Sequence, residues 1–179
     1  MVNDSTRNTA GSTAGRTAPE LAALAGRLLK AKGEKLVTAE SCTGGGVAEA
    51  VTAISGSSEW FDRGFITYSN EAKMEMLRVK PATLESHGAV SEETAREMAL
   101  GALAVSPGTV SVAVTGIAGP TGGSRAKPVG TVCFAWARSG EAMPRSETRR
   151  FPGDRESVRR LSVIHALEGV CGLLDDGGP

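Results

Sequence analysis

The sequence has no excess of charge of either sign, since 20 Lys and Arg residues offset 20 Asp and Glu residues in a chain of 179. No whole-chain positive field is therefore available to hold nucleic acid, and we expect no nucleic-acid partner. The chain also lacks any apolar run near the roughly 18 residues that cross a bilayer. Its first residues lack the apolar core of a signal peptide. We therefore expect a cytoplasmic protein with no membrane partner.

Cysteine and histidine are scarce. The three cysteines, at 42, 133 and 171, are odd in number and widely spaced, so we interpret them as reduced thiols and not as a disulfide framework or a zinc site. Cys133 lies in an apolar run and is expected in the core, whereas the role of Cys42 stays open. With His87 and His165 as the only histidines and no carboxylate cluster, neither a metal site nor a Ser-His-Asp triad is expected. His165, amid apolar residues of a predicted helix, is expected to be a core histidine with satisfied hydrogen bonds.

Helices and strands alternate through most of the chain, which is 40% apolar and 22% charged. Apolar residues at helical spacing, bounded by caps or breakers, predict helices over 19–33, 47–54, 70–77, 91–103 and 154–174. Short apolar or alternating runs predict strands over 35–39, 60–68, 110–115, 129–137 and 145–151. The last strand is polar and is expected at an antiparallel edge. We predict a single three-layer α/β/α domain with a mixed β-sheet over 19–175, a disordered tail over 1–18 and a flexible end over 176–179.

The most informative stretch is Thr38-Ala-Glu-Ser-Cys-Thr-Gly-Gly-Gly46, which joins a predicted strand to a predicted helix. The free N–H groups of the helix would point back at Ser41, and the helix dipole adds positive charge there. Such a turn suits an anion, or the oxyanion formed during acyl transfer, with Gly44 and Gly45 as the donors. The alternative is a glycine-rich turn without chemistry. The stretch is neither a Walker A loop nor the G-x-S-x-G elbow of α/β-hydrolases.

Two further regions also follow predicted strands. Tyr68, the only tyrosine, and Lys73 lie at a second strand-to-helix junction, where the helix dipole favours the neutral amine that a general base requires. The alternative is a solvated lysine on a short helix. The loop over 115–123 is dense in glycine and typical of a binding loop, but it lacks the order of a dinucleotide fingerprint. Arg155, at the start of the last helix, is either a clamp for phosphate or carboxylate or a surface arginine.

These regions, in this order, resemble the CinA C-terminal domain family. The matching blocks are 38–45, 64–73, 88–91, 114–124, 127–131 and 151–155. Together they extend from about residue 20 to residue 174, which is nearly all of the predicted domain. Several long blocks in a fixed order are more specific than any one of the motifs.

The family members known as enzymes are nicotinamide-nucleotide amidases, so the resemblance implies hydrolysis of nicotinamide mononucleotide (NMN) to nicotinate mononucleotide and ammonia. It implies Ser41 as the nucleophile, with Lys73 and Tyr68 sharing its activation and proton transfer. It implies substrate contacts at Thr43, Gly44, Gly45, Thr115, Gly116 and Arg155. It implies neither a metal nor another cofactor, and it suggests a homo-oligomer. The alternative is a non-catalytic module that binds nucleotide or acts as a regulator in competence or DNA damage.

Overall fold

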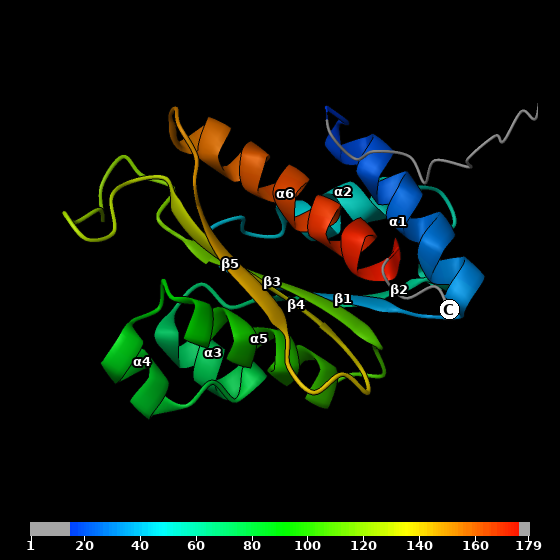
Figure 1. The fold of residues 1–179 in the computed structure, drawn as a ribbon, viewed down its shortest axis with the longest axis horizontal. Helices are drawn as coiled ribbons and strands as arrows, with labels where there is room; N and C mark the ends of the chain where they lie inside the picture. The colour runs from blue at the N-terminus through cyan, green and yellow to red at the C-terminus, as the bar shows by residue number, and fades with distance from the viewer. Residues whose placement is uncertain (1–14, 176–179) are drawn as a thin grey trace, which may run out of the picture.

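The computed structural model describes residues 15–175, and in it a five-stranded sheet lies between two layers of helices (Figure 1). The helices are α1 (Ala18–Lys32), α2 (Gly46–Thr52), α3 (Asn70–Leu77), α4 (Pro81–His87), α5 (Glu92–Ala104) and α6 (Arg155–Asp175), with a single 3₁₀ turn at Ser57–Glu59. The strands are β1 (Leu36–Glu40), β2 (Phe61–Ile66), β3 (Val110–Gly116), β4 (Thr131–Arg138) and β5 (Arg145–Arg150). Residues 1–14 of the tail predicted over 1–18, and the end predicted over 176–179, lie outside the described residues, and α1 begins at the last residue of that predicted tail.

The sheet is mixed, as predicted. Its strand order is β2-β1-β3-β4-β5, with β1 parallel to both β2 and β3, and β4 antiparallel to both β3 and β5. Strands β1 and β3 lie in the interior of the sheet, with helices over both faces, and are buried almost throughout, which accounts for their nearly unbroken runs of small and apolar residues. The polar strand β5 is the antiparallel edge that its composition predicted.

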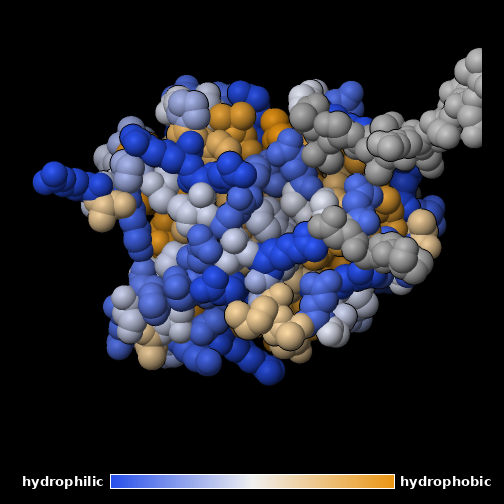
Figure 2. Space-filling view, viewed as in Figure 1, coloured by the Kyte–Doolittle hydropathy of each residue, from blue (hydrophilic) through white to orange (hydrophobic). Residues whose placement is uncertain are grey.

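One helical layer contains α1, α2 and α6, and the other contains α3, α4 and α5 (Figure 1). Each layer packs its apolar residues against its own face of the sheet and forms a separate core cluster. In the first layer, the Trp136 indole N–H of β4 donates to the Ala166 carbonyl of α6 at 2.9 Å. Figure 2 shows hydrophilic residues over most of one face, with hydrophobic ones visible between the helices of the first layer. The α/β/α arrangement therefore follows from burial on both faces of one sheet.

Helix α1 illustrates how local sequence sets the bounds of an element. Thr17 donates from its backbone N–H and its hydroxyl to Glu20, both at 2.7 Å, and so caps the first turn. Pro19 occupies that same turn, where its missing N–H costs nothing. Gly33 ends the helix with φ at 65°, in the left-handed region that glycine enters freely.

Helix α4 is an element that the sequence pattern did not predict. Pro81 occupies its first position, and only Leu84 of this helix packs against the neighbouring apolar cluster. A helix with one apolar contact has no apolar stripe, so helical periodicity gives no signal for it. Each strand also differs from its predicted bounds by one or two residues, and the larger differences are that β2 ends at Ile66 and β4 begins at Thr131.

The rare side chains are placed as follows. All three cysteines are buried and free. His165 is half-buried on α6, with its ring 4.8 Å from that of Phe134 and its two nitrogens facing Glu147 and Glu168. Among residues 15–175, no group of three or more His, Cys, Asp or Glu side chains is arranged to hold a metal ion. In the same part of the chain, no helix is both long enough and apolar enough to cross a membrane.

Candidate active site

The candidate site lies at the carboxyl ends of the parallel strands. The chain leaves β1 toward β2 on one side, and β3 lies on the other side of β1, so these ends form a switch point of the kind where α/β proteins bind ligands. A pocket of about 230 Å³ opens there. Its lining includes six of the predicted site residues: Ser41, Tyr68, Lys73, Thr115, Gly116 and Arg155.

Lys73 and Ser41 meet in the floor of this pocket. Lys73 Nζ lies 3.2 Å from Ser41 Oγ and donates a 2.8 Å hydrogen bond to the Thr67 carbonyl. Ser41 follows β1, whereas Thr67 and Lys73 follow β2, so the pairing of β1 with β2 brings the two side chains together. The distance allows the Ser41 hydroxyl to donate to a neutral Lys73 amine.

The environment of Lys73 favours the neutral amine. The side chain is 1% exposed, and burial lowers the pKa of its amine, an effect that the nearby Cys42 thiol partly opposes. No carboxylate among residues 15–175 forms an ion pair with Lys73. A buried, unpaired lysine of this kind has the properties of a general base for an adjacent hydroxyl.

Glu40 occupies the place that was expected for a ligand anion. Its side chain is fully buried, and its carboxylate accepts hydrogen bonds from the backbone N–H groups of Gly45 (3.1 Å), Val47 (3.0 Å) and Ala48 (2.9 Å). The N–H of Gly44 donates to the Ser41 carbonyl at 3.0 Å. The expected donor role of Gly44 and Gly45 stays a prediction that this geometry does not support, because both N–H groups already have acceptors within the chain.

The two glycines have a conformational role instead. Gly44 has φ at 61° and Gly45 has φ at 98°, both in the region that disfavours side chains. These angles turn the chain sharply enough for Glu40 to reach the start of α2. The sequence does contain a signal for this contact, since an acidic residue ends a strand just before a glycine-rich helix start. The motifs considered above nevertheless predict no role for Glu40.

Thr43 faces away from the pocket. Its side chain is fully buried, its hydroxyl has no hydrogen-bond partner within residues 15–175, and its carbonyl accepts a 2.9 Å hydrogen bond from Arg159. Thr43 lines a different groove, of about 420 Å³, between α1, α2 and α6. Thr43 does not line the candidate pocket, so the substrate contact expected there stays a prediction without support from this geometry.

Arg155 and Tyr68 stand at the mouth of the pocket. Arg155 donates from Nη1 to the Gly119 carbonyl and from Nη2 to the Tyr68 hydroxyl, both at 2.9 Å. The Tyr68 side chain is 61% exposed. Arg155 thus joins the loop after β2 to the glycine-rich loop after β3. The Tyr68 hydroxyl is directed at Arg155 and not at the Ser41–Lys73 pair.

The remaining wall comes from β3 and from the segment before α5. Thr115 Oγ1 donates to the Ala89 carbonyl at 2.8 Å, which fixes the hydroxyl with its lone pairs free to accept. Cys42 also lines the pocket, and burial raises the pKa of its thiol to about 12, so the thiol is protonated and is not a competing nucleophile. Within residues 15–175, the backbone N–H of Cys42 donates to no backbone carbonyl, and it lies against the thiol of its own residue.

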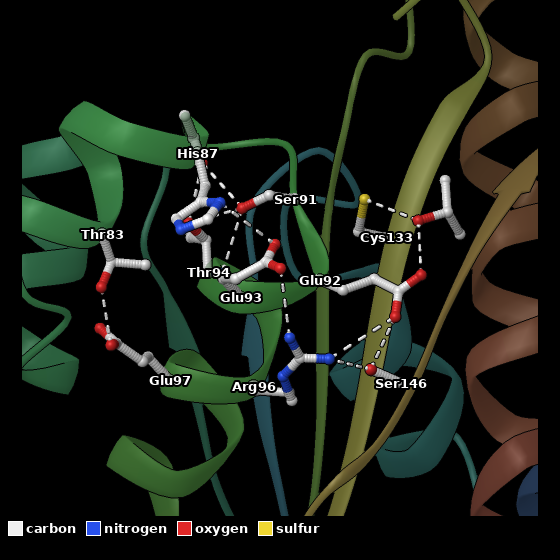
Figure 3. Close-up of polar contacts among 12 residues, drawn as sticks. Thr83, His87, Ser91, Glu92, Glu93, Thr94, Arg96, Glu97, Cys133 and Ser146 are labelled. Carbon is white, nitrogen blue, oxygen red and sulfur yellow. Dashed lines mark hydrogen bonds and ion pairs between the residues drawn. The ribbon is translucent and has the colours of Figure 1, made fainter.

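A larger cavity, of about 690 Å³, lies beside the start of α5 (Figure 3). Its polar groups bond to one another, because Ser146 (2.8 Å) and Thr148 (2.9 Å) donate to Glu92 and Arg96 donates to Ser146 at 2.6 Å. Burial raises the pKa of the Cys133 thiol in its wall, and within the described part of the chain this thiol contacts the hydroxyl of Thr148 and no base. The cavity therefore offers no activated nucleophile, and the smaller pocket is the better candidate despite its size.

Comparisons of the sequence and of the structure with known proteins indicate the same family. The family model for the CinA C-terminal domain matches residues 18–174. The chain is 53% identical over 150 residues to the nicotinamide-nucleotide amidohydrolase PncC of Escherichia coli (strain K12), covering 83% of this chain and 90% of that protein. It is 50% identical over 153 residues to the protein of the same name from Pseudomonas putida, covering 86% and 94%. A crystal structure of competence damage-inducible protein A from Klebsiella pneumoniae superposes with a TM-score of 0.87 at 40% identity, covering 91% of this chain and all of that one.

Proposed function

The chain belongs to the CinA C-terminal domain family, and on that premise we propose that it hydrolyses the carboxamide of NMN to nicotinate mononucleotide and ammonia. The observation that carries the proposal is the contact between Lys73 Nζ and Ser41 Oγ, 3.2 Å apart in the floor of a pocket. A nucleophile beside a buried base is the equipment of an acyl-transfer enzyme. The names of the relatives supply the substrate class.

The reaction begins with attack of Ser41 Oγ on the carboxamide carbon, while Lys73 Nζ accepts the hydroxyl proton. The carbonyl π bond opens and leaves negative charge on oxygen. When this intermediate collapses, the C–N bond breaks and the nitrogen takes the proton from Lys73, so ammonia leaves and an ester on Ser41 remains. Water then adds to the ester with Lys73 again as the base, and nicotinate mononucleotide departs as Ser41 regains its proton.

The backbone N–H of Cys42 is the donor that we propose for the oxyanion. It belongs to the residue after the nucleophile, this residue lines the pocket, and the N–H donates to no backbone carbonyl within residues 15–175. In α/β-hydrolases, a different fold, the N–H at this position serves the oxyanion. Removing one such donor typically costs about 3 kcal/mol of transition-state stabilisation. This donor replaces Gly44 and Gly45 in the proposed mechanism.

Arg155, Tyr68 and Thr115 are the proposed substrate contacts. Arg155 and Tyr68 lie at the mouth, where the ribose phosphate would emerge from a pocket that is smaller than most sites for whole ligands, which occupy about 300–1,000 Å³. Thr115 Oγ1 has lone pairs that suit the amide N–H groups of the substrate. A part for Tyr68 in proton transfer stays a prediction, because its hydroxyl contacts Arg155.

The test is ammonia release from NMN by the purified protein and by two variants. We expect Ser41→Ala, which removes the nucleophile, to lose at least about a thousandfold in kcat. Lys73→Ala, which removes the general base, should lose about 10²- to 10⁴-fold. Ser58→Ala and Lys35→Ala, at exposed positions away from the pocket, serve as matched controls and should keep full activity. Unchanged turnover in both site variants would remove the mechanism. Tight NMN binding without any ammonia from the parent protein would favour the non-catalytic module.

A further inference from the structure

Glu40 is a buried acidic residue that the proposed chemistry does not use. It ends β1, its side chain is fully buried, and Ser41 follows it directly. It does not line the candidate pocket, so it does not contact the substrate. A carboxylate in the interior is costly unless charge and hydrogen bonds compensate it. The presence of a buried Glu40 beside the nucleophile therefore needs a physical reason.

The compensation comes from the first turn of α2. The carboxylate accepts three backbone hydrogen bonds of 2.9 to 3.1 Å, from Gly45, Val47 and Ala48. Gly45 is the N-cap residue of α2 and has no side chain to cap it. Glu40 therefore acts as the cap from five residues upstream, and its negative charge lies at the positive end of the helix dipole. These charge-assisted hydrogen bonds are among the stronger ones available in a protein.

The backbone of Glu40 is tied to the other side of the pair. Its carbonyl accepts the N–H of Thr67 at 2.8 Å, and the carbonyl of Thr67 accepts Lys73 Nζ at 2.8 Å. The N–H of Ser41 donates to the carbonyl of Val114 in β3 at 2.9 Å. Backbone hydrogen bonds thus hold the start of the turn that carries Ser41 against its neighbours in the sheet, and the Glu40 side chain connects this turn to α2.

We propose that Glu40 is a positioning residue for the Ser41–Lys73 pair. Its carboxylate ties α2 to the end of β1 and so holds Ser41 Oγ at its 3.2 Å distance from Lys73 Nζ. The effect on turnover rests on the proposed amidase function, whereas the effect on geometry does not.

The test compares Glu40→Gln with Glu49→Gln. The glutamine side chain has the size of glutamate, but its NH₂ group faces a donor that needs an acceptor, so one of the three hydrogen bonds is lost. Glu49 lies on the same helix and is exposed, which makes it the matched control. We expect Glu40→Gln to lower kcat about 10- to 100-fold with KM within about twofold, since small displacements of reacting groups cost factors of this size. Glu49→Gln should match the parent protein.

Two measurements separate positioning from loss of folded protein. Titration calorimetry with NMN, in a Ser41→Ala background, counts the binding-competent sites, and kcat is expressed per such site. A crystal structure of Glu40→Gln gives the Ser41 Oγ to Lys73 Nζ distance, which we expect to exceed hydrogen-bond length. An unchanged distance of 3.2 Å, or an unchanged kcat per site in an active enzyme, overturns the proposal.

A protein without activity on NMN would refute the proposed function and leave the distance measurement to decide on Glu40. If Glu40→Gln does not fold, Glu40→Asp replaces it. Aspartate keeps the negative charge at the helix start but is one methylene too short to reach all three N–H groups. The same displacement and the same loss in kcat are expected for it, and an unchanged pair would count against the proposal in the same way.

Discussion

Replacing Lys73 by methionine should remove activity and change the pH dependence of stability. Burial lowers the pKa of the Lys73 amine in the folded state from its ordinary value of 10.5. Between these two pKa values the unfolded chain binds one proton more than the folded chain. Stability therefore rises with pH in this window, by about 1.4 kcal/mol per pH unit. The cost of burying Lys73 is absent above pH 10.5, grows as the pH falls, and stops growing below the folded-state pKa.

Lys73→Met keeps an unbranched side chain of similar length and removes this titration. It also removes the hydrogen bonds to Thr67 and Ser41, and each typically contributes about 0.5–1.5 kcal/mol at any pH. The stability of the variant relative to the parent should therefore improve by about 1.4 kcal/mol for each pH unit below 10.5, down to the folded-state pKa. Its kcat should fall by about 10²- to 10⁴-fold, the usual contribution of a general base.

The assay is urea unfolding of both proteins from pH 6 to pH 10, followed by the fluorescence of the buried Trp60 and Trp136. Lys35→Met, at an exposed lysine, provides the matched control and should follow the parent at every pH. A stability difference between Lys73→Met and the parent that stays constant over this range would refute the reasoning. The amine would then titrate alike in the folded and unfolded chains, and Lys73 would have no neutral form at working pH.

Two further predictions concern packing and thiol chemistry. Gly101→Ala should destabilise the fold by several kcal/mol in the same urea assay, because its Cβ would lie 1.9 Å from the Leu77 carbonyl oxygen. Gly172→Ala, with open space around its Cβ, should instead raise the free energy of unfolding by up to about 1 kcal/mol through helix propensity. Equal effects of the two substitutions would contradict the packing of α5 on α3. Cys42 of the folded protein should resist alkylation by iodoacetamide at pH 8, because a pKa of about 12 leaves it with roughly a thousandth of the thiolate of an ordinary thiol. Rapid alkylation of Cys42, detected by mass spectrometry, would show that this thiol is ionised or exposed.

Much of the fold was predictable because each main element has a local pattern. The polar strand β5 was placed at the antiparallel edge from its composition, and the buried strands β1 and β3 from their apolar runs. Helix α4 was missed because a single apolar contact, at Leu84, leaves no periodic signal. Patterns of period 3.6 or 2 report burial, so an element with little burial escapes them.

The candidate site, like the fold, was predictable from the sequence only in part. Ser41 and Lys73 were expected to meet because each follows a parallel strand, and parallel strands end at one edge of the sheet. The partners of individual N–H groups were not predictable, because they depend on the turn at Gly44 and Gly45 and on a side chain folding back from Glu40. The same turn rotates Thr43 into the groove beside α6. Motif spacing specifies which residues are near one another, but not which way each side chain points.

An edge strand of the sheet positions Lys73, the proposed general base for Ser41. Lys73 stands on the helix that follows β2, and β2 pairs with β1 alone. Edge segments with few buried contacts open at a lower free energy than central strands do. A brief separation of β2 from β1 carries Lys73 away from Ser41 while α1, α6 and the central strands stay folded. Heating should therefore stop catalysis reversibly at temperatures where most of the native structure persists, so the working range of the enzyme is narrower than its melting point indicates.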